Sequence, residues 1–417
     1  MSQRPAVITC HDCGLLQKIS HLPEDGTVTC SRCDATLRKI ERIKPADNIE
    51  HLLALVITAL VIFIIANSFP VIDLQVAGHE VETSLYGIIH YLLTRSDYFL
   101  GGLVFLTALG APLIQLTGLL YILLPLNSNV IPPFAAQVYR VVRLITQWSM
   151  LEVLMLGLIV SLVKLSAMGT LIPSVALFAF LALIFFIADI LSNINSEIIW
   201  SKISTIKQDP RLKDSERPEN ITNCHNCHLL CKIPEHHEGR CPRCDSPLHK
   251  RKPDSMARCT AYLIAAVVLY IPANLLPVMV VSSLGHSEGE TIMGGIIYLG
   301  TSGDMSLAII VFVASMVVPS IKLIILTLLL ITTYFKSQWN MKDRTRLYRL
   351  TELIGRWSMV DIFVTASMAA LIQIQGLAVI EVGGGAIAFG AVVVLTILAA
   401  MSFDPRLIWD NLEKKNE

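Results

Sequence analysis

Charged residues are scarce in this chain of 417 residues. They make up 16% of it, whereas a typical soluble domain carries about 25%. The 33 Lys and Arg are balanced by 33 Asp and Glu, so no net positive charge indicates a nucleic-acid partner. The sequence also lacks a Gly-x-x-x-x-Gly-Lys-[Ser/Thr] phosphate loop, a His-Glu-x-x-His motif and a nucleophile elbow. These deficits argue against a soluble enzyme and a DNA-binding protein, and the 53% hydrophobic content indicates a polytopic membrane protein.

Eight apolar runs are long enough to cross a membrane as helices, which takes about 20 residues each. They form two groups of four, so the expected fold is an all-α membrane protein. The predicted spans are 52–72, 99–124, 148–171 and 173–191 in the first group, and 258–281, 305–335, 357–380 and 383–403 in the second. Very short turns near 168–174 and 375–385 are predicted to join the last two spans of each group. The first thirty residues are polar and contain no apolar core of a cleavable signal.

Positive residues alternate from one connecting segment to the next. Thirty of the 33 Lys and Arg lie in segments 1–50, 126–147, 192–258, 336–356 and 403–417. Because cytoplasmic segments retain positive charge, both termini and the central polar segment are predicted to be cytoplasmic. The opposite loops, near 73–98 and 280–305, are too small for a catalytic domain. We expect them to form short strands or a lip for a partner, and we expect the protein not to be an enzyme.

The chain resembles itself at a shift of about 207 to 214 residues. Segment 66–71 matches 273–278, and segment 147–152 matches 356–361. Each half is predicted to be a small cysteine domain followed by four helices, and an even helix number makes the two repeats parallel. The predicted domains are a ribbon at 1–47, a four-helix module at 48–200, a linker with a second ribbon at 201–252, and a four-helix module with a short tail at 253–417.

Eight of the ten cysteines form two sets of paired Cys-x-x-Cys turns, with 16 and 13 residues between the pairs. Two such turns aim four thiolates at one point, as in a closed zinc ribbon. Segments of about 45 residues with little apolar core need a metal to fold, and the reducing cytoplasm favours metal over disulfides. The predicted zinc ligands are Cys10, Cys13, Cys30 and Cys33 in the first ribbon and Cys224, Cys227, Cys241 and Cys244 in the second.

Other interpretations of the cysteines stay open. A four-thiolate cage also suits iron, as in a rubredoxin-like electron-transfer centre, and a Cys-x-x-Cys pair can itself be redox-active. Nearby side chains are possible substitute ligands, although solvated loop positions explain them more simply; these are His11, His225, His228, His236, His237 and Cys231.

Ionisable side chains inside apolar spans are costly, and they usually face a protein interior or a water-filled path. Lys322 is predicted to lie about 20 Å from the cytoplasmic end of its helix, three residues after a kink at Pro319, which favours a functional role. Glu152 and Asp361 are predicted only about 6 Å from cytoplasmic helix ends, where capping is an equal explanation. The resulting difference in depth, about 14 Å, argues against a direct Lys322–Asp361 ion pair. Lys164 is predicted to snorkel to the outer surface.

These features together resemble one family, the paraquat-inducible protein A family of Gram-negative inner-membrane proteins. The residues that carry the resemblance are the duplicated cysteine ribbons, Pro-Ala-Asn-Leu-Leu-Pro at 272–277, Gly-Arg-Trp-Ser-Met-Val-Asp at 355–361 and Phe-Asp-Pro-Arg-Leu-Ile-Trp-Asp at 403–410. The first half departs more from this pattern, since it lacks the Asp-Pro-Arg before Trp200. Activity that depends on those residues is therefore assigned to the second half.

The resemblance implies a function and a partner that the residues alone do not. Such proteins work with a periplasmic MCE-domain tunnel protein, and they pass phospholipid between the inner membrane and that tunnel. It also implies zinc-bound cytoplasmic ribbons and tetraspanin/claudin-like helix modules. A polar patch for the lipid headgroup would come from Lys322, with Asp361, Arg356, Ser315 and Ser320.

Two alternatives come from different classes of protein. One is a membrane redox protein with iron in the four-cysteine sites, and the other is a membrane sensor or scaffold whose ribbons bind a cytoplasmic partner.

Overall fold

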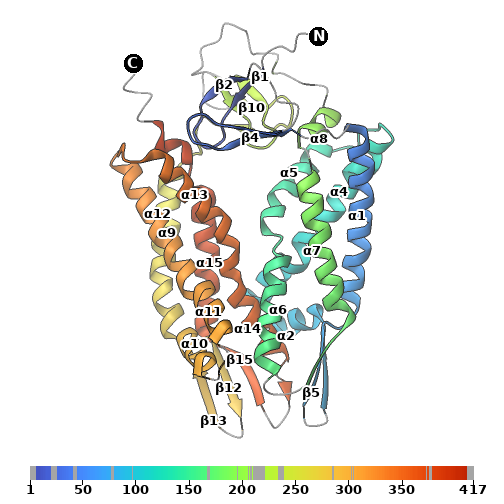
Figure 1. The fold of residues 1–417 in the computed structure, drawn as a ribbon, viewed down its shortest axis with the longest axis vertical. Coiled ribbons are helices and arrows are strands. Elements are labelled where there is room, and N and C mark those ends of the chain that lie inside the picture. Colours follow the sequence, from blue (N-terminus) through green and yellow to red (C-terminus); the bar gives the residue numbers. More distant parts are fainter. Residues whose placement is uncertain are drawn as a thin grey trace.

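The structure is a computed structural model that describes residues 6–19, 26–40, 45–76, 79–95, 97–166, 170–194, 196–204, 206, 209, 221–232, 239–283, 286–301, 303, 305–371, 373–374 and 378–410. Two groups of helices stand side by side, with small β elements over one end and longer strands at the other (Figure 1). We call these the ribbon end and the strand end. Residues 45–203 are called module 1 and residues 255–410 module 2.

Each small β element consists of two antiparallel hairpins. Ribbon 1 (residues 6–40) pairs β1 (Ala6–Thr9) with β2 (Leu16–Ile19) and β3 (Gly26–Thr29) with β4 (Thr36–Ile40). Ribbon 2 (residues 221–248) pairs β8 (Ile221–Asn223) with β9 (Leu230–Lys232) and β10 (Gly239–Arg240) with β11 (Pro247–Leu248). Strands this short have little apolar surface to bury, so the hairpins need another source of stability.

The two modules follow nearly the same order of elements; β14 (Gln373–Ile374) has no counterpart in module 1, and the last element is an α-helix in module 1 and a 3₁₀ turn in module 2. Module 1 contains α1 (Pro45–Ser68), β5 (Ile72–Val76), β6 (His79–Thr83), α2 (Leu85–Thr94), α3 (Tyr98–Val104), the π-helical turn η1 (Phe105–Gly110), α4 (Ala111–Asn127), α5 (Ala135–Ile145), the 3₁₀ turn η2 (Thr146–Trp148), α6 (Leu151–Ser166), β7 (Thr170–Pro173), α7 (Val175–Asn193) and α8 (Ser196–Ile203).

Module 2 contains α9 (Ser255–Leu275), β12 (Met279–Ser283), β13 (His286–Glu290), α10 (Ile292–Thr301), α11 (Met305–Phe312), the π-helical turn η4 (Val313–Val317), α12 (Val318–Tyr334), α13 (Met341–Ile354), the 3₁₀ turn η5 (Gly355–Met359), α14 (Val360–Leu371), β14 (Gln373–Ile374), β15 (Ala378–Val382), α15 (Gly384–Ser402) and η6 (Pro405–Ile408).

The described part of the chain holds eight helical spans that are long and apolar enough to cross a membrane, the number predicted from the sequence. They are Ile49–Ser68, Tyr98–Asn127, Ala135–Val163, Val175–Asn193, Ser255–Leu275, Ala308–Tyr334, Met341–Ala370 and Gly384–Ser402. Many exposed side chains on these helices are large and apolar, such as Val61, Phe185 and Ile324. Such a surface is stable against lipid and unstable against water.

Short antiparallel sheets occupy the strand end of both modules. Module 1 has the strand order β6-β5-β7, and module 2 has β13-β12-β15-β14. The short strands expected in the loops near 73–98 and 280–305 are therefore present, and each strand pair is followed by a short apolar helix, α2 or α10, that the sequence did not predict. The predicted tight turns near 168–174 and 375–385 are wrong, because β7 and β15 lie there and end the preceding helices at Ser166 and Leu371. Pairing with β5 and β12 satisfies the backbone hydrogen bonds of these connections.

A glycine run lets the start of α15 approach the segment that follows α9 closely. Cβ atoms added at Gly383 and Gly385 would lie 2.1 Å and 2.5 Å from the carbonyl oxygens of Pro277 and Leu276. The amide of Gly385 instead donates to the Pro277 carbonyl at 2.9 Å. The Leu-Leu-Pro end of α9 and the start of α15 thus fit only when these positions lack a side chain.

The third span of each module is a broken helix, which corrects the predicted boundaries. The apolar runs begin at Trp148 and Trp357, but helix extends back to Ala135 and Met341 through α5–η2 and α13–η5. Hydropathy misses these extensions because α5 and α13 carry charged residues. Glu152 and Asp361 do lie in the first turns of α6 and α14, close to helix ends as predicted, but these ends are breaks inside a span and not the start of the span.

Helices α6 and α14 pack across the boundary between the modules. A Cβ added at Gly157 in α6 would lie 2.7 Å from the Cβ of Phe363 in α14, so the two backbones approach as closely as glycine allows. Ser161, one turn further along α6, donates to the Val364 carbonyl at 3.4 Å. Small residues at helix crossings are the usual means of close packing in membranes.

Gly157→Ala tests this crossing, because close packing predicts that alanine lowers stability here, whereas helix propensity alone predicts that it raises stability. Alanine favours helix over glycine by about 1 kcal/mol, but here its Cβ would clash with a Cβ that cannot rotate away. We expect Gly157→Ala to lower stability by about 1–3 kcal/mol. The control Gly102→Ala, in α3, has no atom within 4 Å of the added carbon and should raise stability slightly. Thermal unfolding in detergent measures both, and equal effects would contradict the packing.

Candidate metal centres and intramembrane polar site

All four Cys-x-x-Cys turns have the same backbone geometry. In each turn the amide of the residue after the second cysteine donates to the carbonyl of the first cysteine, at 2.8–3.0 Å. That residue has a positive φ in every turn: 74° at Gly14, 58° at Asp34, 55° at His228 and 57° at Asp245. Glycine and aspartate tolerate this conformation, so local sequence favours the turns before any metal binds.

The sulfur atoms of each ribbon converge on one point. Distances between sulfurs are 3.5 Å for Cys10–Cys33, 3.6 Å for Cys13–Cys30, 3.5 Å for Cys224–Cys244 and 3.4 Å for Cys227–Cys241. Within each group of four, all sulfurs lie within 4.8 Å of one another. Metal–sulfur bonds of about 2.3 Å in a tetrahedron give edges of about 3.8 Å, whereas a disulfide is about 2.05 Å long. The two clusters therefore fit a four-thiolate metal ion.

Polar groups outside each cluster donate to its sulfur atoms. In ribbon 1, Gln17 Nε2 lies 2.9 Å from Cys30 Sγ, and Arg349 Nη2 lies 3.4 Å from Cys33 Sγ. In ribbon 2, the Ser246 hydroxyl lies 2.9 Å from Cys244 Sγ and 3.2 Å from Cys224 Sγ. Donors of this kind stabilise thiolates, as expected around a metal centre.

The possible substitute ligands lie outside the four-cysteine groups among the residues that the structure describes. His11 faces Asp12 at 3.2 Å, His225 accepts from Arg406 at 2.8 Å, and His228 lies 3.3 Å from Arg143 Nη2. His236 and His237 lie outside the described residues. Cys231 is fully buried beside Cys241.

Ribbon 1 docks on the module that is distant in sequence. Arg349 of α13 donates to Asp12 at 2.5 Å and to the Cys33 carbonyl at 3.0 Å, and Arg346 lies 3.2 Å from Asp34. The charges of α13, which make it look unlike a membrane span, thus bind the first ribbon to module 2.

Ribbon 2, which lies in the second half of the chain, docks on the first half. Arg143 of α5 donates to the Asn226 carbonyl of ribbon 2, and Arg243 of ribbon 2 donates to the Ile206 carbonyl after α8 at 2.9 Å. Ribbon 1 therefore contacts module 2, whereas ribbon 2 contacts module 1 and the residue just after it. Together the two ribbons connect the modules at the ribbon end.

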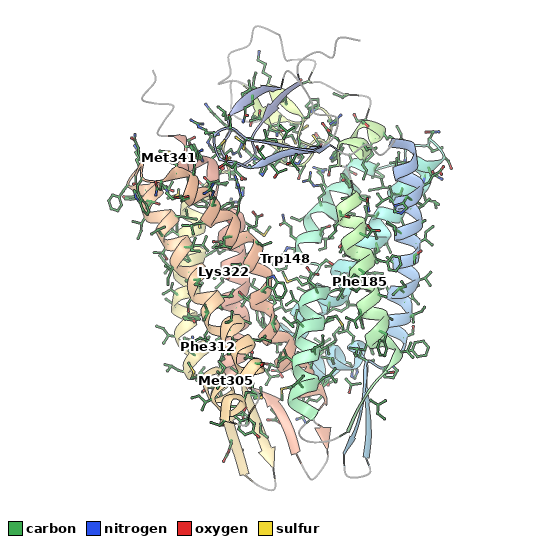
Figure 2. All side chains as sticks on the ribbon, in the orientation of Figure 1. Trp148, Phe185, Met305, Phe312, Lys322 and Met341 are labelled. Atoms are coloured by element: carbon green, nitrogen blue, oxygen red, sulfur yellow. The ribbon has the colours of Figure 1, made fainter. Side chains whose placement is uncertain are left out.

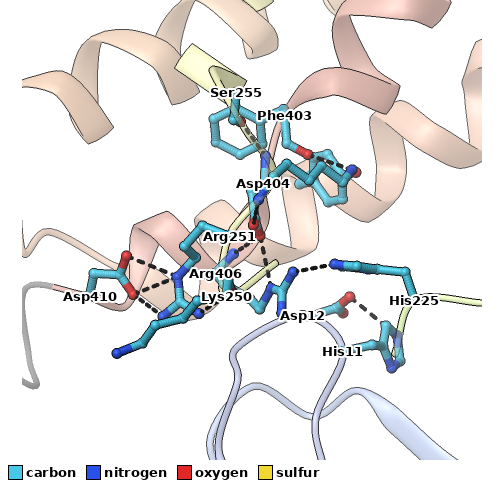
Figure 3. Close-up of polar contacts among 12 residues, drawn as sticks. His11, Asp12, His225, Lys250, Arg251, Ser255, Phe403, Asp404, Arg406 and Asp410 are labelled. Carbon is cyan, nitrogen blue, oxygen red and sulfur yellow. Dashed lines mark hydrogen bonds and ion pairs between the residues drawn. The ribbon is translucent and has the colours of Figure 1, made fainter. Parts of the chain in front are cut away.

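Asp404 organises the junction between module 2 and both ribbons (Figure 3). Its carboxylate accepts from Arg406 Nε at 3.0 Å and from the Lys252 amide at 3.0 Å, and its own amide donates to Ser255 Oγ at 2.9 Å. Arg406 in turn reaches His225 of ribbon 2, and its side chain lies against Gly14 of ribbon 1. Burial raises the pKa of Asp404, but Arg406 and the hydrogen bonds outweigh this and hold the pKa below its usual 3.8.

The amine of Lys322 is buried inside module 2. Lys322 is 1% exposed, and its Nζ donates to Thr396 Oγ1 at 2.9 Å and to the Gly355 carbonyl at 3.4 Å. Figure 2 shows Lys322 about midway between the ribbon end and the strand end. Both acceptors are neutral, and the described residues show no direct ion pair between Lys322 and Asp361. A cation in this position is costly unless a further negative group joins it.

Hydroxyl groups lie on the elements around Lys322. Ser315 in η4 and Ser358 in η5 are 1% exposed, and their oxygens have no hydrogen-bond partner within the described chain. These two turns pack against each other. Ser320 is partnered, since it lies 2.8 Å from the Tyr270 hydroxyl. The helix predicted to kink at Pro319 has a π-helical turn just before that residue, and such turns often mark functional sites.

Module 1 has a neutral counterpart at the same place. Gln115, which matches Lys322 in the repeat, is fully buried, and its amide has no hydrogen-bond partner among the described residues. The break of its third span contacts the matching π-helical turn, where the Met150 amide donates to the Thr107 carbonyl at 3.3 Å. The two modules thus share a framework, but only module 2 places a cation in it.

The structure describes the remaining predicted site residues only in part. Glu152 is exposed and Asp361 half-buried, each in the first turn after its break. Arg356 lies in η5 and Lys164 in α6, and their side chains are outside the described residues. Sequence reasoning missed Thr396 and Gly355; the one signal for Thr396 is a polar residue inside an apolar run.

Fold and site together define a polytopic membrane protein with two four-cysteine groups that can hold metal. The model of the family described as paraquat-inducible protein A matches residues 49–204 and again 256–413. The chain belongs to this family. The double match falls on the two modules and leaves the ribbons outside it.

Named relatives cover nearly the whole chain. Lipophilic envelope-spanning tunnel protein A of Escherichia coli K12 is 32% identical over 98% of this chain and 92% of its own length. Intermembrane transport protein PqiA of the same strain is 31% identical over 97% of this chain and 95% of its own. A probable intermembrane transport protein of Haemophilus influenzae is 27% identical, over 97% and 95%. No solved structure matches the chain.

Asp404→Asn should destabilise the junction at pH 7, by about 1–3 kcal/mol for a buried charged hydrogen-bonding group. Because the folded pKa is lowered, the contribution of Asp404 is complete above its unfolded pKa of about 3.9 and is lost as the pH falls through the folded value. The gap in thermal stability between wild type and variant should therefore narrow below about pH 4. Asp410→Asn, at the half-buried pair with Arg251, is the control and should cost less. A gap that is constant with pH would contradict this account.

Proposed function

We propose that this protein is the inner-membrane component of a phospholipid transport system. It passes lipid between the inner membrane and a periplasmic MCE-domain tunnel protein. Support comes from its membership of the family and from relatives named as intermembrane transport and envelope-spanning tunnel proteins. Its residues act by binding and positioning lipid, and the energy comes from an ion gradient, the partner or the lipid gradient.

The proposed orientation puts the ribbon end and both termini in the cytoplasm. The excess of Lys and Arg in the segments at that end supports it. The strand end then faces the periplasm, where the small sheets would meet the tunnel protein.

The proposed metal is zinc, one ion in each ribbon, held by Cys10, Cys13, Cys30 and Cys33 and by Cys224, Cys227, Cys241 and Cys244. The spacing of the sulfurs and their hydrogen-bond donors support a structural site. The proposed domains are the ribbon and module pairs 1–47 with 48–200 and 201–252 with 253–417. We propose that they form two parallel repeats with tetraspanin/claudin-like modules.

The observation that carries the proposal is the buried amine of Lys322 with neutral partners. Among the described residues this cation has no negative partner; a lipid phosphate would supply one, and a charged hydrogen bond to it is worth about 1.5–3 kcal/mol. Ser315 adds a buried hydroxyl without a described partner, which can donate to phosphate oxygens. Ser320, Arg356 and Asp361 lie on the same or the facing elements and complete the proposed headgroup patch. Glu152 and Lys164 are proposed as polar residues of the first module along the same path.

Lys322→Met separates stability from function. Because the buried charge is costly, the variant should fold at least as stably as wild type in detergent. Phospholipid transfer between labelled donor vesicles and the partner should fall about ten- to a hundredfold, the equivalent of the lost phosphate contact. Gln115→Met, at the matching neutral site, is the control and should transfer lipid nearly normally. Unchanged transfer by Lys322→Met would refute the headgroup site.

A further inference from the structure

Ribbon 2 contains a fifth cysteine at its metal site. Cys231, in β9, is fully buried, and its sulfur lies 3.9 Å from that of Cys241. Its other contact is the Leu229 carbonyl, at 3.5 Å. The thiol thus points at one of the four sulfurs, although it stands outside the group of four that converges on one point.

Ribbon 1 shows what this position does when it is not a cysteine. Gln17 in β2 follows Cys10 by the same seven residues as Cys231 follows Cys224. The amide of Gln17 donates to Cys30, the third cysteine of its set, as Cys241 is of the second set. Both ribbons therefore aim this side chain at the same ligand. The difference is that glutamine only donates a hydrogen bond, whereas a thiol can also bind the metal.

We propose that Cys231 is a reserve metal ligand that exchanges with Cys241, so that ribbon 2 has two alternative sets of four thiolates. In the exchange, the Cys231 thiol gives its proton to the Cys241 thiolate and takes over the bond to the metal. One proton moves, one sulfur–metal bond forms and one breaks, and the total charge is unchanged. The 3.9 Å contact between the two sulfurs is the path for that proton.

The structure makes the exchange specific to ribbon 2 and to one ligand. Cys231 lies in β9, the strand that follows the first knuckle, and its sulfur is already 3.9 Å from that of Cys241, so the exchange requires no new fold. Cys241 begins the second knuckle, whose Arg243 donates to the Ile206 carbonyl just after module 1. Loss of Cys241 would leave Cys224, Cys227, Cys231 and Cys244 as a complete set. Loss of Cys30 in ribbon 1 would leave three cysteines and Gln17.

Metal release tests the proposal on the full-length protein in detergent. Protein produced in zinc-supplemented medium is treated with a chromogenic chelator, and the amount and rate of zinc release are measured. The variants are Cys241→Ser, Cys231→Ser, Cys231→Ser/Cys241→Ser and Cys30→Ser. We expect Cys241→Ser and Cys231→Ser to release ribbon 2 metal within about threefold of wild type. The double variant should release it at least about tenfold faster, a loss of about 1.4 kcal/mol in the barrier to release. Cys30→Ser should lose its ribbon 1 metal equally fast.

Cobalt substitution supplies a second readout that counts sulfurs directly, since the sulfur-to-cobalt absorption grows with the number of thiolates. Cys241→Ser should keep the wild-type intensity of the sulfur-to-cobalt absorption. The double variant should lose the part of that intensity that one thiolate contributes. If Cys241→Ser and the double variant match in both intensity and release rate, Cys231 is no ligand and the proposal is wrong. This result would leave the lipid-transport proposal untouched, because it concerns only the ribbon.

Discussion

The position of one amine constrains much of module 2. Lys322 lies between apolar helices, and every group that solvates it must come from the protein or its ligand. The break between α13 and α14 leaves the Gly355 carbonyl within reach of Nζ, and α15 supplies the Thr396 hydroxyl. A continuous helix would bind that carbonyl internally. The break, the π-helical turn before Pro319 and the buried hydroxyls are thus parts of one polar site inside a lipid-facing bundle.

The modules are joined differently at their two ends. Near the strand end, α6 and α14 touch through Gly157, and the exposed pair Arg95–Glu381 adds a weaker link. At the ribbon end the link runs through the ribbons, which dock on arginines of α5 and α13 and meet at Arg406. A metal that holds the ribbons folded therefore also holds the modules together. A movement of one module against the other would change these contacts.

The sequence predicts the parts that follow from composition and spacing. Eight spans, two cysteine groups and a buried position for Lys322 are visible in hydropathy, in Cys-x-x-Cys spacing and in a charge inside an apolar run. The sequence does not predict the break between α13 and α14, because α13 carries the arginines that bind ribbon 1, Arg346 and Arg349. These charges make the segment resemble a loop. The partners of Lys322 could not be predicted, since a backbone carbonyl has no sequence signal. The crosswise docking of the ribbons likewise depends on tertiary contacts alone.

We propose that the helices handle lipid and that the cysteines hold a structural metal. Extraction of the protein from its own membrane into native lipid discs, followed by mass spectrometry of the intact assembly, tests both parts together. The account predicts an MCE-domain tunnel protein, bound phospholipid and two zinc ions per chain, one for each four-cysteine group. Iron in the cysteine sites, with no tunnel protein and no retained phospholipid, would contradict it and would assign the function to the ribbons.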